Sequence, residues 1–266
     1  MAGGQTILLH IGKPCYCLHS CTPALPNLIK RIMNFAIISA GEGSRLAQER
    51  VAKPKPLVEL NGEAMIERLV RIFMRQGAHR VVVIINDLVP ETKEFLTRLC
   101  EELPIELVVK TTPSSMHSFY EISHLLEGER FCLTTVDTIF REEEFARYIQ
   151  AFRTSEADGL MAVTDYVDDE KPLYISTTDD LSITGFHDQP THDCRYISGG
   201  IYCLTPKALE TLHRCMDEGL SRMRNFQRQL VADGLHLKAW PFSKIVDVDH
   251  AGDIVKAEEF LRATSD

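Results

Sequence analysis

The stretch Asn34–Leu57, NFAIISAGEGSRLAQERVAKPKPL, decides the fold class of this chain. Its apolar beginning, Phe35 to Ile38, is typical of a buried strand, and the small residues that follow break the run. Gly41 and Gly43 lack a Cβ atom, so the backbone there can turn sharply and present its N–H groups to phosphate oxygens. The sequence therefore predicts a strand that leads into a phosphate-binding loop.

Two cationic side chains follow this loop. Arg45 comes two residues after the second glycine, and Lys55 lies in the segment 54–57, PKPL. Positive charge beside a glycine loop suits a bound polyphosphate. The loop matches neither GxxxxGK[ST] nor GxGxxG, because the lysine of the first motif and the third glycine of the second are missing. Taken alone, the glycines also fit an ordinary tight turn; the two cations favour the functional interpretation.

The segments SAGEGSRL and KPKPL together resemble the family of nucleotidyltransferases that includes the sugar-1-phosphate enzymes, or NDP-sugar pyrophosphorylases, and the molybdenum cofactor guanylyltransferases. The resemblance implies two catalytic residues. Arg45 would contact the outer phosphates of an NTP, and Lys55 would stabilise the reacting phosphoryl groups. It also implies that the loop binds the nucleotide through Ser39, Ala40, Gly41, Gly43 and Ser44.

Apolar strands alternate with helix-like segments along the first half of the chain. The pattern predicts helices over 64–76, from Pro90 and near 118–126, and strands over 80–85, 105–109 and 131–136. Such alternation predicts an α/β fold, Rossmann-like, with three layers (α/β/α) and a mostly parallel central sheet. Ligands are then expected at the carboxyl ends of the strands.

The pattern changes after about residue 158. Strands are predicted in closer succession over 160–164, 173–176, 182–186 and 196–204, and helices return over 206–217 and 221–233. This order predicts a smaller antiparallel portion joined to the first half. The resemblance implies that this portion binds the acceptor while the first half binds the nucleotide.

The first residues of the chain differ in composition from everything that follows. Residues 1–33 show little periodicity, and Met33 stands immediately before the first confident strand. We interpret 1–33 as an N-terminal extension that arises from a misassigned start codon, and 34–266 as a single nucleotidyltransferase domain. A hydrophobic content of 44% is ample for a core of this size.

Charge and cysteine content narrow the partners and the compartment. The net charge of −9 disfavours a nonspecific nucleic-acid or acidic-membrane binder, because such proteins need an extended basic surface. No run approaches the roughly 20 apolar residues of a membrane span. The eight cysteines are scattered, which favours reduced thiols and a cytoplasmic location. The expected partners are therefore small molecules, with no nucleic acid and no membrane.

Acidic residues follow two apolar segments that are far apart in the sequence. Asp137 comes directly after the strand 131–136, and the segment IVDVD supplies Asp247 and Asp249. Mg²⁺ prefers oxygen ligands and commonly takes one or two carboxylates together with phosphate oxygens. Helix capping explains such aspartates equally well without a family match. The resemblance favours Asp137 and Asp247 as ligands of a Mg²⁺ cofactor, with Asp249 as the reserve candidate.

Two further segments are candidates for the nucleoside and acceptor pockets. The resemblance places Ser115 and Ser118 beside the base and ribose, although both also fit simple helix capping. Asp188 stands where many sugar nucleotidyltransferases carry Glu-Lys-Pro; the lysine is missing here, which weakens the case for a hexose-1-phosphate. Gly199 and Gly200 resemble the glycine-containing strand beside the acceptor, and they also fit a bulge or turn.

Together with the family resemblance, these features predict a nucleotidyltransferase of enzyme class EC 2.7.7. The preferred reaction is transfer of NMP from an NTP to a phosphorylated acceptor, in the first instance a sugar-1-phosphate, with release of pyrophosphate. A guanylyl- or cytidylyltransferase for a non-sugar acceptor and a non-catalytic nucleotide-binding protein are the alternatives. The sequence leaves the base, the acceptor and the oligomeric state open.

Overall fold

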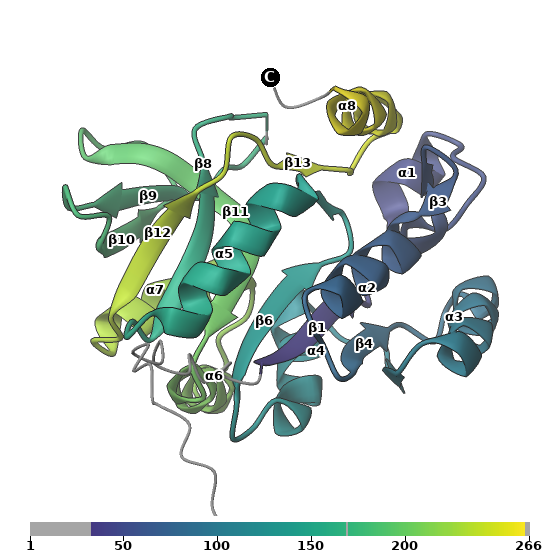
Figure 1. The fold of residues 1–266 in the computed structure, drawn as a ribbon. Helices are drawn as coiled ribbons and strands as arrows, with labels where there is room; N and C mark the ends of the chain where they lie inside the picture. Colours follow the sequence, from purple (N-terminus) through teal and green to yellow (C-terminus); the bar gives the residue numbers. More distant parts are fainter. Residues whose placement is uncertain (1–32, 169, 264–266) are drawn as a thin grey trace, which may run out of the picture. The chain divides into compact units, whose positions relative to one another are not determined.

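The computed structural model describes residues 33–168 and 170–263, and its fold begins with a fully buried strand (Figure 1). Strand β1, Met33–Ser39, alternates its side chains between the two faces of the sheet. Phe35 and Ile37 belong to one apolar cluster, and Ala36 and Ile38 belong to a second cluster on the opposite face. The near-continuous apolar run thus reflects a strand covered on both sides.

Within the described residues, nine strands form one sheet in which parallel and antiparallel pairs are segregated. Strands β6, β1, β4 and β5 lie side by side and are all parallel. Strand β11 pairs antiparallel with β6, β8 and β9, and β12 pairs parallel with β8. The strands are β1 (Met33–Ser39), β2 (Glu59–Leu60), β3 (Glu63–Ala64), β4 (Val81–Ile85), β5 (Ile105–Val109), β6 (Arg130–Thr135), β7 (Thr138–Ile139), β8 (Gly159–Thr164), β9 (Tyr174–Thr177), β10 (Ile183–His187), β11 (Cys194–Leu204), β12 (Leu237–Pro241) and β13 (Val246–Asp247).

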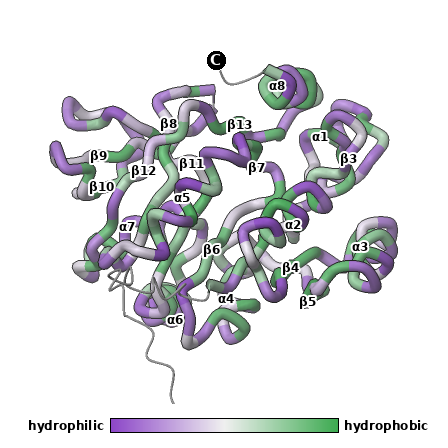
Figure 2. Tube along the Cα trace, in the orientation of Figure 1, coloured by the Kyte–Doolittle hydropathy of each residue, from purple (hydrophilic) through white to green (hydrophobic). Residues whose placement is uncertain are grey.

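Helices cover both faces of this sheet. In Figure 1, α2 and α5 lie in front of the strands, whereas α4 and α6 lie behind them. Figure 2 shows the apolar strands enclosed between helices whose outer sides are hydrophilic. The helices are α1 (Ser44–Gln48), α2 (Met65–Arg75), α3 (Pro90–Glu102), α4 (Ser115–Ile122), α5 (Glu142–Thr154), α6 (Lys207–Asp217), α7 (Met223–Ala232) and α8 (Ala251–Arg262), with short 3₁₀ turns at Lys55–Leu57 and Ser123–Leu125.

The two apolar clusters separate the helices by face. Phe73 of α2 and Phe145 of α5 stack with ring centroids 5.5 Å apart on the first face. Phe119 of α4 and Phe226 of α7 meet edge to face at 5.4 Å on the second. Aromatic pairs of this kind add to the apolar area that each helix buries. The predicted α/β/α layering with a mostly parallel, mixed sheet is therefore confirmed.

Several features of the described residues bear on the remaining predictions. The predicted strand 105–109 coincides with β5, whereas α5 and β12 were not predicted. Cys100, Cys132, Cys194, Cys203 and Cys215 are free thiols, as expected for these five positions. None of the helices that the structure describes is long and apolar enough to cross a membrane. Apart from Met33 itself, the predicted N-terminal extension lies outside the described residues.

Candidate active site

The loop between β1 and α1 forms one wall of a cavity of about 570 Å³. Gly43 has a φ of +61°, a left-handed conformation that favours glycine. A Cβ atom added at Gly43 would lie 2.8 Å from the Cβ of Lys55, so a side chain there would push the lysine out of place. Gly41 is different, because no atom lies within 4 Å of the Cβ it lacks. The second glycine therefore shapes the loop and also makes room for Lys55.

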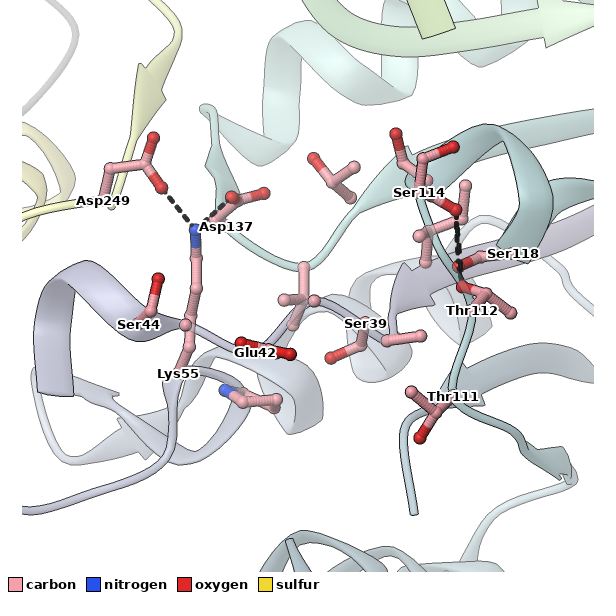
Figure 3. A pocket seen from close by; sticks show the side chains of 18 of the residues that line it. Ser39, Glu42, Ser44, Lys55, Thr111, Thr112, Ser114, Ser118, Asp137 and Asp249 are labelled. Carbon is pink, nitrogen blue, oxygen red and sulfur yellow. Dashed lines mark hydrogen bonds and ion pairs between the residues drawn. The ribbon is translucent and has the colours of Figure 1, made fainter. Parts of the chain in front are cut away.

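Lys55 sits between two carboxylates that come from distant parts of the chain (Figure 3). Its Nζ contacts the Oδ2 atom of Asp137 and lies 2.6 Å from the Oδ1 atom of Asp249. The lysine side chain is only 13% exposed. Burial would lower the pKa of Lys55, but the charges of Asp137 and then Asp249 outweigh it and raise the pKa above its ordinary value. The lysine therefore remains cationic at neutral pH.

Asp137 lies at the carboxyl end of β6, in the turn that leads into β7. Burial tends to raise the pKa of its carboxyl group, and the charge of Lys55 more than offsets this and lowers the pKa. Its Oδ1 atom is buried and has no hydrogen-bond partner among the described residues. A buried carboxylate oxygen without a partner is costly unless another group completes it. This oxygen is suited to contact a cation.

The C-terminal segment reaches the site through a short ladder. Strand β13 pairs antiparallel with β7, and the backbone N–H of Val248 donates to the carbonyl oxygen of Asp137 at 3.1 Å. This pairing brings Asp249 into the first cavity, whereas Asp247, which is exposed, lines a neighbouring cavity. Asp249, the reserve candidate from the sequence, is therefore the acid that lies beside Lys55, and the preferred candidate Asp247 lies in the other cavity.

Arg45 stands at the junction of the two cavities. Its Nη1 atom donates to the Oδ2 atom of Asp249 at 2.8 Å, and its side chain is 50% exposed. Arg45 and Asp249 are the two residues that line both cavities. A half-exposed guanidinium at this position can donate hydrogen bonds to phosphate oxygens.

The wall opposite the glycine loop is made of small hydroxyl residues from the segment between β5 and α4 (Figure 3). Thr112 and Ser118 share a hydrogen bond of 2.6 Å between their hydroxyl oxygens. Ser115 and Ser118 both line the cavity, as predicted, while Ser114 is the residue that precedes the first turn of α4. Ser114 makes no side-chain capping bond; its Oγ lies 2.9 Å from Nδ1 of His117.

Asn86, which the sequence analysis did not single out, fixes the glycine loop from behind. It follows β4 and is 5% exposed. Its Nδ2 donates to the carbonyl oxygen of Gly41 at 3.0 Å and to that of Ala40 at 3.4 Å, and its Oδ1 accepts from the N–H of Leu88. With these carbonyls held away from the cavity, the loop can present N–H groups to it. An asparagine at the end of a parallel strand was the available sequence signal.

A pair of hydrogen bonds joins the end of α1 to the start of α8. The carboxylate of Glu49 accepts hydrogen bonds from Nδ1 of His250 at 2.5 Å and from the N–H of Ala251 at 2.6 Å. The hydrogen bond to Glu49 raises the pKa of His250, and the same bond lowers the pKa of Glu49. This contact ties the nucleotide-side loop to the segment that carries Asp249.

The second cavity has a volume of about 320 Å³ and adjoins the first through Arg45 and Asp249. Gly199 lines it, and the predicted place of this glycine beside an acceptor stays a prediction. A Cβ atom at Gly199 would lie 2.2 Å from Cδ1 of Ile245 and 3.2 Å from the carbonyl oxygen of Ala162. Glycine is therefore required for the close packing of β11 against this segment.

Two predicted acceptor residues do not line either cavity. Asp188 bonds Nη1 of Arg224 at 2.5 Å and Nη2 of Arg228 at 2.7 Å. These contacts, with Arg228 first, lower the pKa of its carboxyl group. Gly200 adopts a φ of +73°, and its missing Cβ would lie 3.1 Å from the hydroxyl of Thr138. Both residues have structural partners outside the cavities, and their predicted contact with an acceptor stays a prediction.

All of the residues predicted for the nucleotide line the first cavity. The cavity brings together the predicted residues Ser39, Ala40, Gly41, Gly43, Ser44, Arg45, Lys55, Ser115, Ser118 and Asp137. Within residues 33–168 and 170–263, no group of three or more His, Cys, Asp or Glu side chains could hold a metal ion alone. The arrangement is one of three carboxylates, Glu42, Asp137 and Asp249, and two cations, Arg45 and Lys55, around a pocket of backbone and hydroxyl groups. Such a pocket suits a nucleotide whose phosphates complete the coordination of a divalent cation.

Comparison with known proteins identifies the family to which this chain belongs. A model of the MobA-like NTP transferase domain matches residues 35–232, so the chain belongs to this family. It is 29% identical over 114 residues to a 2-aminoethylphosphonate cytidylyltransferase of Lancefieldella rimae, covering 41% of this chain and 45% of the relative. It is 24% identical over 186 residues to a mannose-1-phosphate guanylyltransferase catalytic subunit beta of Dictyostelium discoideum, covering 68% and 52%. The chain thus spans about half the length of these curated relatives.

A solved structure shows the same fold. The structure of the inositol-1-phosphate CTP transferase from T. maritima superposes with a TM-score of 0.68 at 18% identity. The superposition covers 88% of this chain and 99% of that one. The two proteins therefore share their architecture over nearly the whole described part of this chain.

Proposed function

We propose that this protein transfers NMP from an NTP to a phosphorylated small-molecule acceptor and releases pyrophosphate. The observation that carries this proposal is the cluster of Asp137, Lys55 and Asp249 directly beside the glycine loop. Family membership supports it, because the matched domain is an NTP transferase domain. Neighbouring cavities that share Arg45 and Asp249 suit two substrates that react at their junction.

In the proposed reaction, an ionised oxygen of the acceptor attacks the α-phosphorus of the NTP. One phosphorus–oxygen bond forms, the bond between the α-phosphorus and the bridging oxygen breaks, and pyrophosphate leaves with the electron pair. A phosphate is already ionised near neutral pH, so no general base is needed. The protein contributes mainly by positioning the reactants and neutralising charge.

The chain's own groups divide this work. The N–H groups of the loop at Gly41 and Gly43, together with Arg45, would hold the β- and γ-phosphates that leave. The cationic Lys55, fixed between Asp137 and Asp249, would stabilise charge at the α-phosphate. The hydroxyl wall that includes Ser118 would contact the nucleoside.

The carboxylates of Asp137 and Asp249 fit a resident Mg²⁺. The unpartnered, buried Oδ1 of Asp137 and the partly exposed carboxylate of Asp249 are hard oxygen ligands on opposite sides of Lys55. Bound there, Mg²⁺ would supply positive charge to the reacting phosphates. Asp249 replaces Asp247 in this proposal because Asp249 lines the nucleotide cavity and Asp247 does not.

Two classes of acceptor are candidates. A sugar-1-phosphate is the prediction from the sequence, and its support is the similarity to a mannose-1-phosphate guanylyltransferase. A non-sugar acceptor is supported by the similarity to a 2-aminoethylphosphonate cytidylyltransferase and by the lysine missing beside Asp188. In both cases the acceptor's phosphate or phosphonate would lie beside the α-phosphate, where the two cavities adjoin.

A pyrophosphate-release screen tests the proposal. The purified full chain is assayed with each of the four NTPs, a panel of phosphorylated acceptors, and Mg²⁺ or a chelator. We expect release with one acceptor class, dependent on Mg²⁺ and lost in Asp137→Asn and Asp249→Asn. Asp179→Asn, at an exposed acid that lines neither cavity, is the control. NTP binding without release for any acceptor would leave a nucleotide-binding protein as the better description.

A further inference from the structure

The second cavity is lined by more acidic than basic side chains, which is unusual for a site that binds an anionic compound. Of the residues that line it, five are carboxylates and two, Arg45 and Lys256, are cationic. Arg45 lies at the junction with the nucleotide cavity, so positive charge is concentrated where a phosphate would react. The other end of the cavity is dominated by negative charge, which attracts a cation and repels an anion.

The structure already shows how these carboxylates bind an ammonium group. The Nζ atom of Lys256 lies 2.9 Å from Oδ2 of Asp168 and 3.2 Å from Oδ1 of Asp253. Hydrogen bonds from the lysine lower the pKa of Asp168, so its carboxylate stays ionised. The wall of this cavity therefore bonds a primary ammonium through oxygen acceptors.

One carboxylate at this wall retains bonding capacity towards a ligand. The carboxylate of Glu170 is 65% exposed, and its Oε1 lies 3.6 Å from Nε2 of His250, which is too long for a hydrogen bond. Nε2 of His250 is itself buried and has no hydrogen-bond partner among the described residues, while Nδ1 is held by Glu49. The exposed carboxylate of Glu170, which lines this cavity, is therefore open to a ligand that donates a hydrogen bond.

The lining also distinguishes between kinds of cation. Quaternary ammonium groups are recognised by the faces of several aromatic rings. Among the described residues that line this cavity, Tyr166 is the only aromatic one, and the Nζ of Lys244 lies 4.0 Å from its ring centroid. The hydroxyl of Tyr166 donates to Asp168. Carboxylates without a free aromatic face favour an ammonium that can donate hydrogen bonds.

We propose that the acceptor carries a phosphate or phosphonate at one end and a primary ammonium group at the other, with the ammonium bound by Glu170 and Asp168 in the second cavity. This inference rests on the proposed function, because the acceptor's phosphorus group must meet the α-phosphate of the nucleotide where the two cavities adjoin. A volume of about 320 Å³ suits such a short compound.

A set of matched acceptors tests the proposal. Pyrophosphate release is measured with the productive NTP and with phosphoethanolamine, 2-aminoethylphosphonate, phosphocholine, ethyl phosphate and glucose-1-phosphate. We expect kcat/KM for one of the primary ammonium compounds to exceed that for ethyl phosphate at least about tenfold, the size of one hydrogen bond to a charged group. Comparison of phosphoethanolamine with 2-aminoethylphosphonate identifies the phosphorus group, and phosphocholine is expected to be poorer than either.

Two outcomes of this panel overturn the inference in different ways. If glucose-1-phosphate or ethyl phosphate is used as well as the ammonium compounds, the proposed transfer stands and the ammonium subsite falls. If no acceptor supports release with any NTP, the proposed function falls and the inference falls with it.

A charge-removing variant locates the subsite. Glu170→Gln is expected to raise KM for the ammonium acceptor about tenfold and to leave the kcat/KM ratio for ethyl phosphate undiminished. Asp168→Asn provides a second variant, and Glu127→Gln removes an exposed charge that lines neither cavity as the control. Equal losses for the charged and the uncharged acceptor in both variants would show a structural role only and overturn the assignment.

Discussion

The two neighbouring cavities are built in different ways. The first is made largely of backbone and hydroxyl groups from segments such as 39–45 and 111–118, at the carboxyl ends of parallel strands. The second contains seven charged side chains, mainly from the loop after β8 and from residues 247–256, and β11 lines it with the uncharged residues Ile197, Ser198 and Gly199. Under the proposed function, the part of the site for the common substrate, the NTP, would be held by the sheet, and the part for the specific acceptor would be carried by side chains at its periphery.

The largest effect is expected at the lysine that lies between the two carboxylates. Lys55→Ala removes the cation that stabilises the reacting phosphates, and kcat for pyrophosphate release should fall by about 10²–10³-fold. The variant also leaves the buried carboxylate of Asp137 without its ion pair, so thermal unfolding is expected at a lower temperature, with recovery when Mg²⁺ is added.

Lys53→Ala is the matched control for this experiment. Lys53 is exposed and bonds Glu59 at 2.5 Å, outside both cavities. It should retain nearly full activity and stability, because exposed ion pairs contribute little. Full turnover by Lys55→Ala would show that this lysine has no role in the mechanism. It would also contradict the view that the first cavity holds the reacting phosphates.

The next effect is expected at the second glycine of the loop. Gly43→Ala forces an alanine into a left-handed conformation, which costs about 1–2 kcal/mol, and places its Cβ against Lys55. We expect a lower melting temperature and a loss of activity of about tenfold or more, since the lysine must move.

Gly41→Ala isolates the cause of that loss. Nothing lies within 4 Å of a Cβ atom at Gly41, and its backbone is not left-handed, so stability should remain close to that of the natural chain. If both variants lost stability equally, the close approach of loop and lysine would not be the reason for glycine at position 43.

The first cavity was largely predictable from sequence because most of its residues lie in segments that directly follow strands of the parallel part of the sheet. Gly41, Gly43 and Arg45 follow one strand directly, and Asp137 follows another, so the parallel sheet alone brings them to the same edge. The same reasoning gave the strand 105–109 and the helices on both faces. Local pattern and sheet topology are sufficient for this half of the site.

The second cavity was not predictable in this way, since long-range pairing decides which side chains meet. The choice between Asp247 and Asp249 depends on the ladder between β13 and β7, two strands of two residues each. Asp188 follows β10, yet Arg224 and Arg228 of α7 bind it outside the cavity. Helix α5 and strand β12 were also missed, and β12 ends in a proline, which weakens its sequence signal.

A smaller effect is expected for the asparagine that holds the glycine loop. Asn86→Asp retains the acceptor for the N–H of Leu88 but loses both donated bonds to the carbonyls of Ala40 and Gly41. We expect KM for the NTP to rise about tenfold, with a smaller change in kcat, because the loop loses its preorganised shape. KM for the acceptor is the internal control and should stay unchanged if the two cavities act separately. A rise in acceptor KM alone would contradict the assigned role.

The smallest effect is expected at Asp188. Asp188→Asn breaks the ion pairs with Arg224 and Arg228, which are partly exposed, and should change the melting temperature little, because exposed ion pairs contribute little to stability. Because the structure places Asp188 outside both cavities, kcat/KM for the acceptor should change less than about twofold, within the range of most surface substitutions. Kinetics with the acceptor identified by the screen provide the measurement. A large and selective rise in acceptor KM would instead extend the acceptor site to the end of β10, as the sequence predicted, and would make the acceptor larger than the second cavity alone can hold.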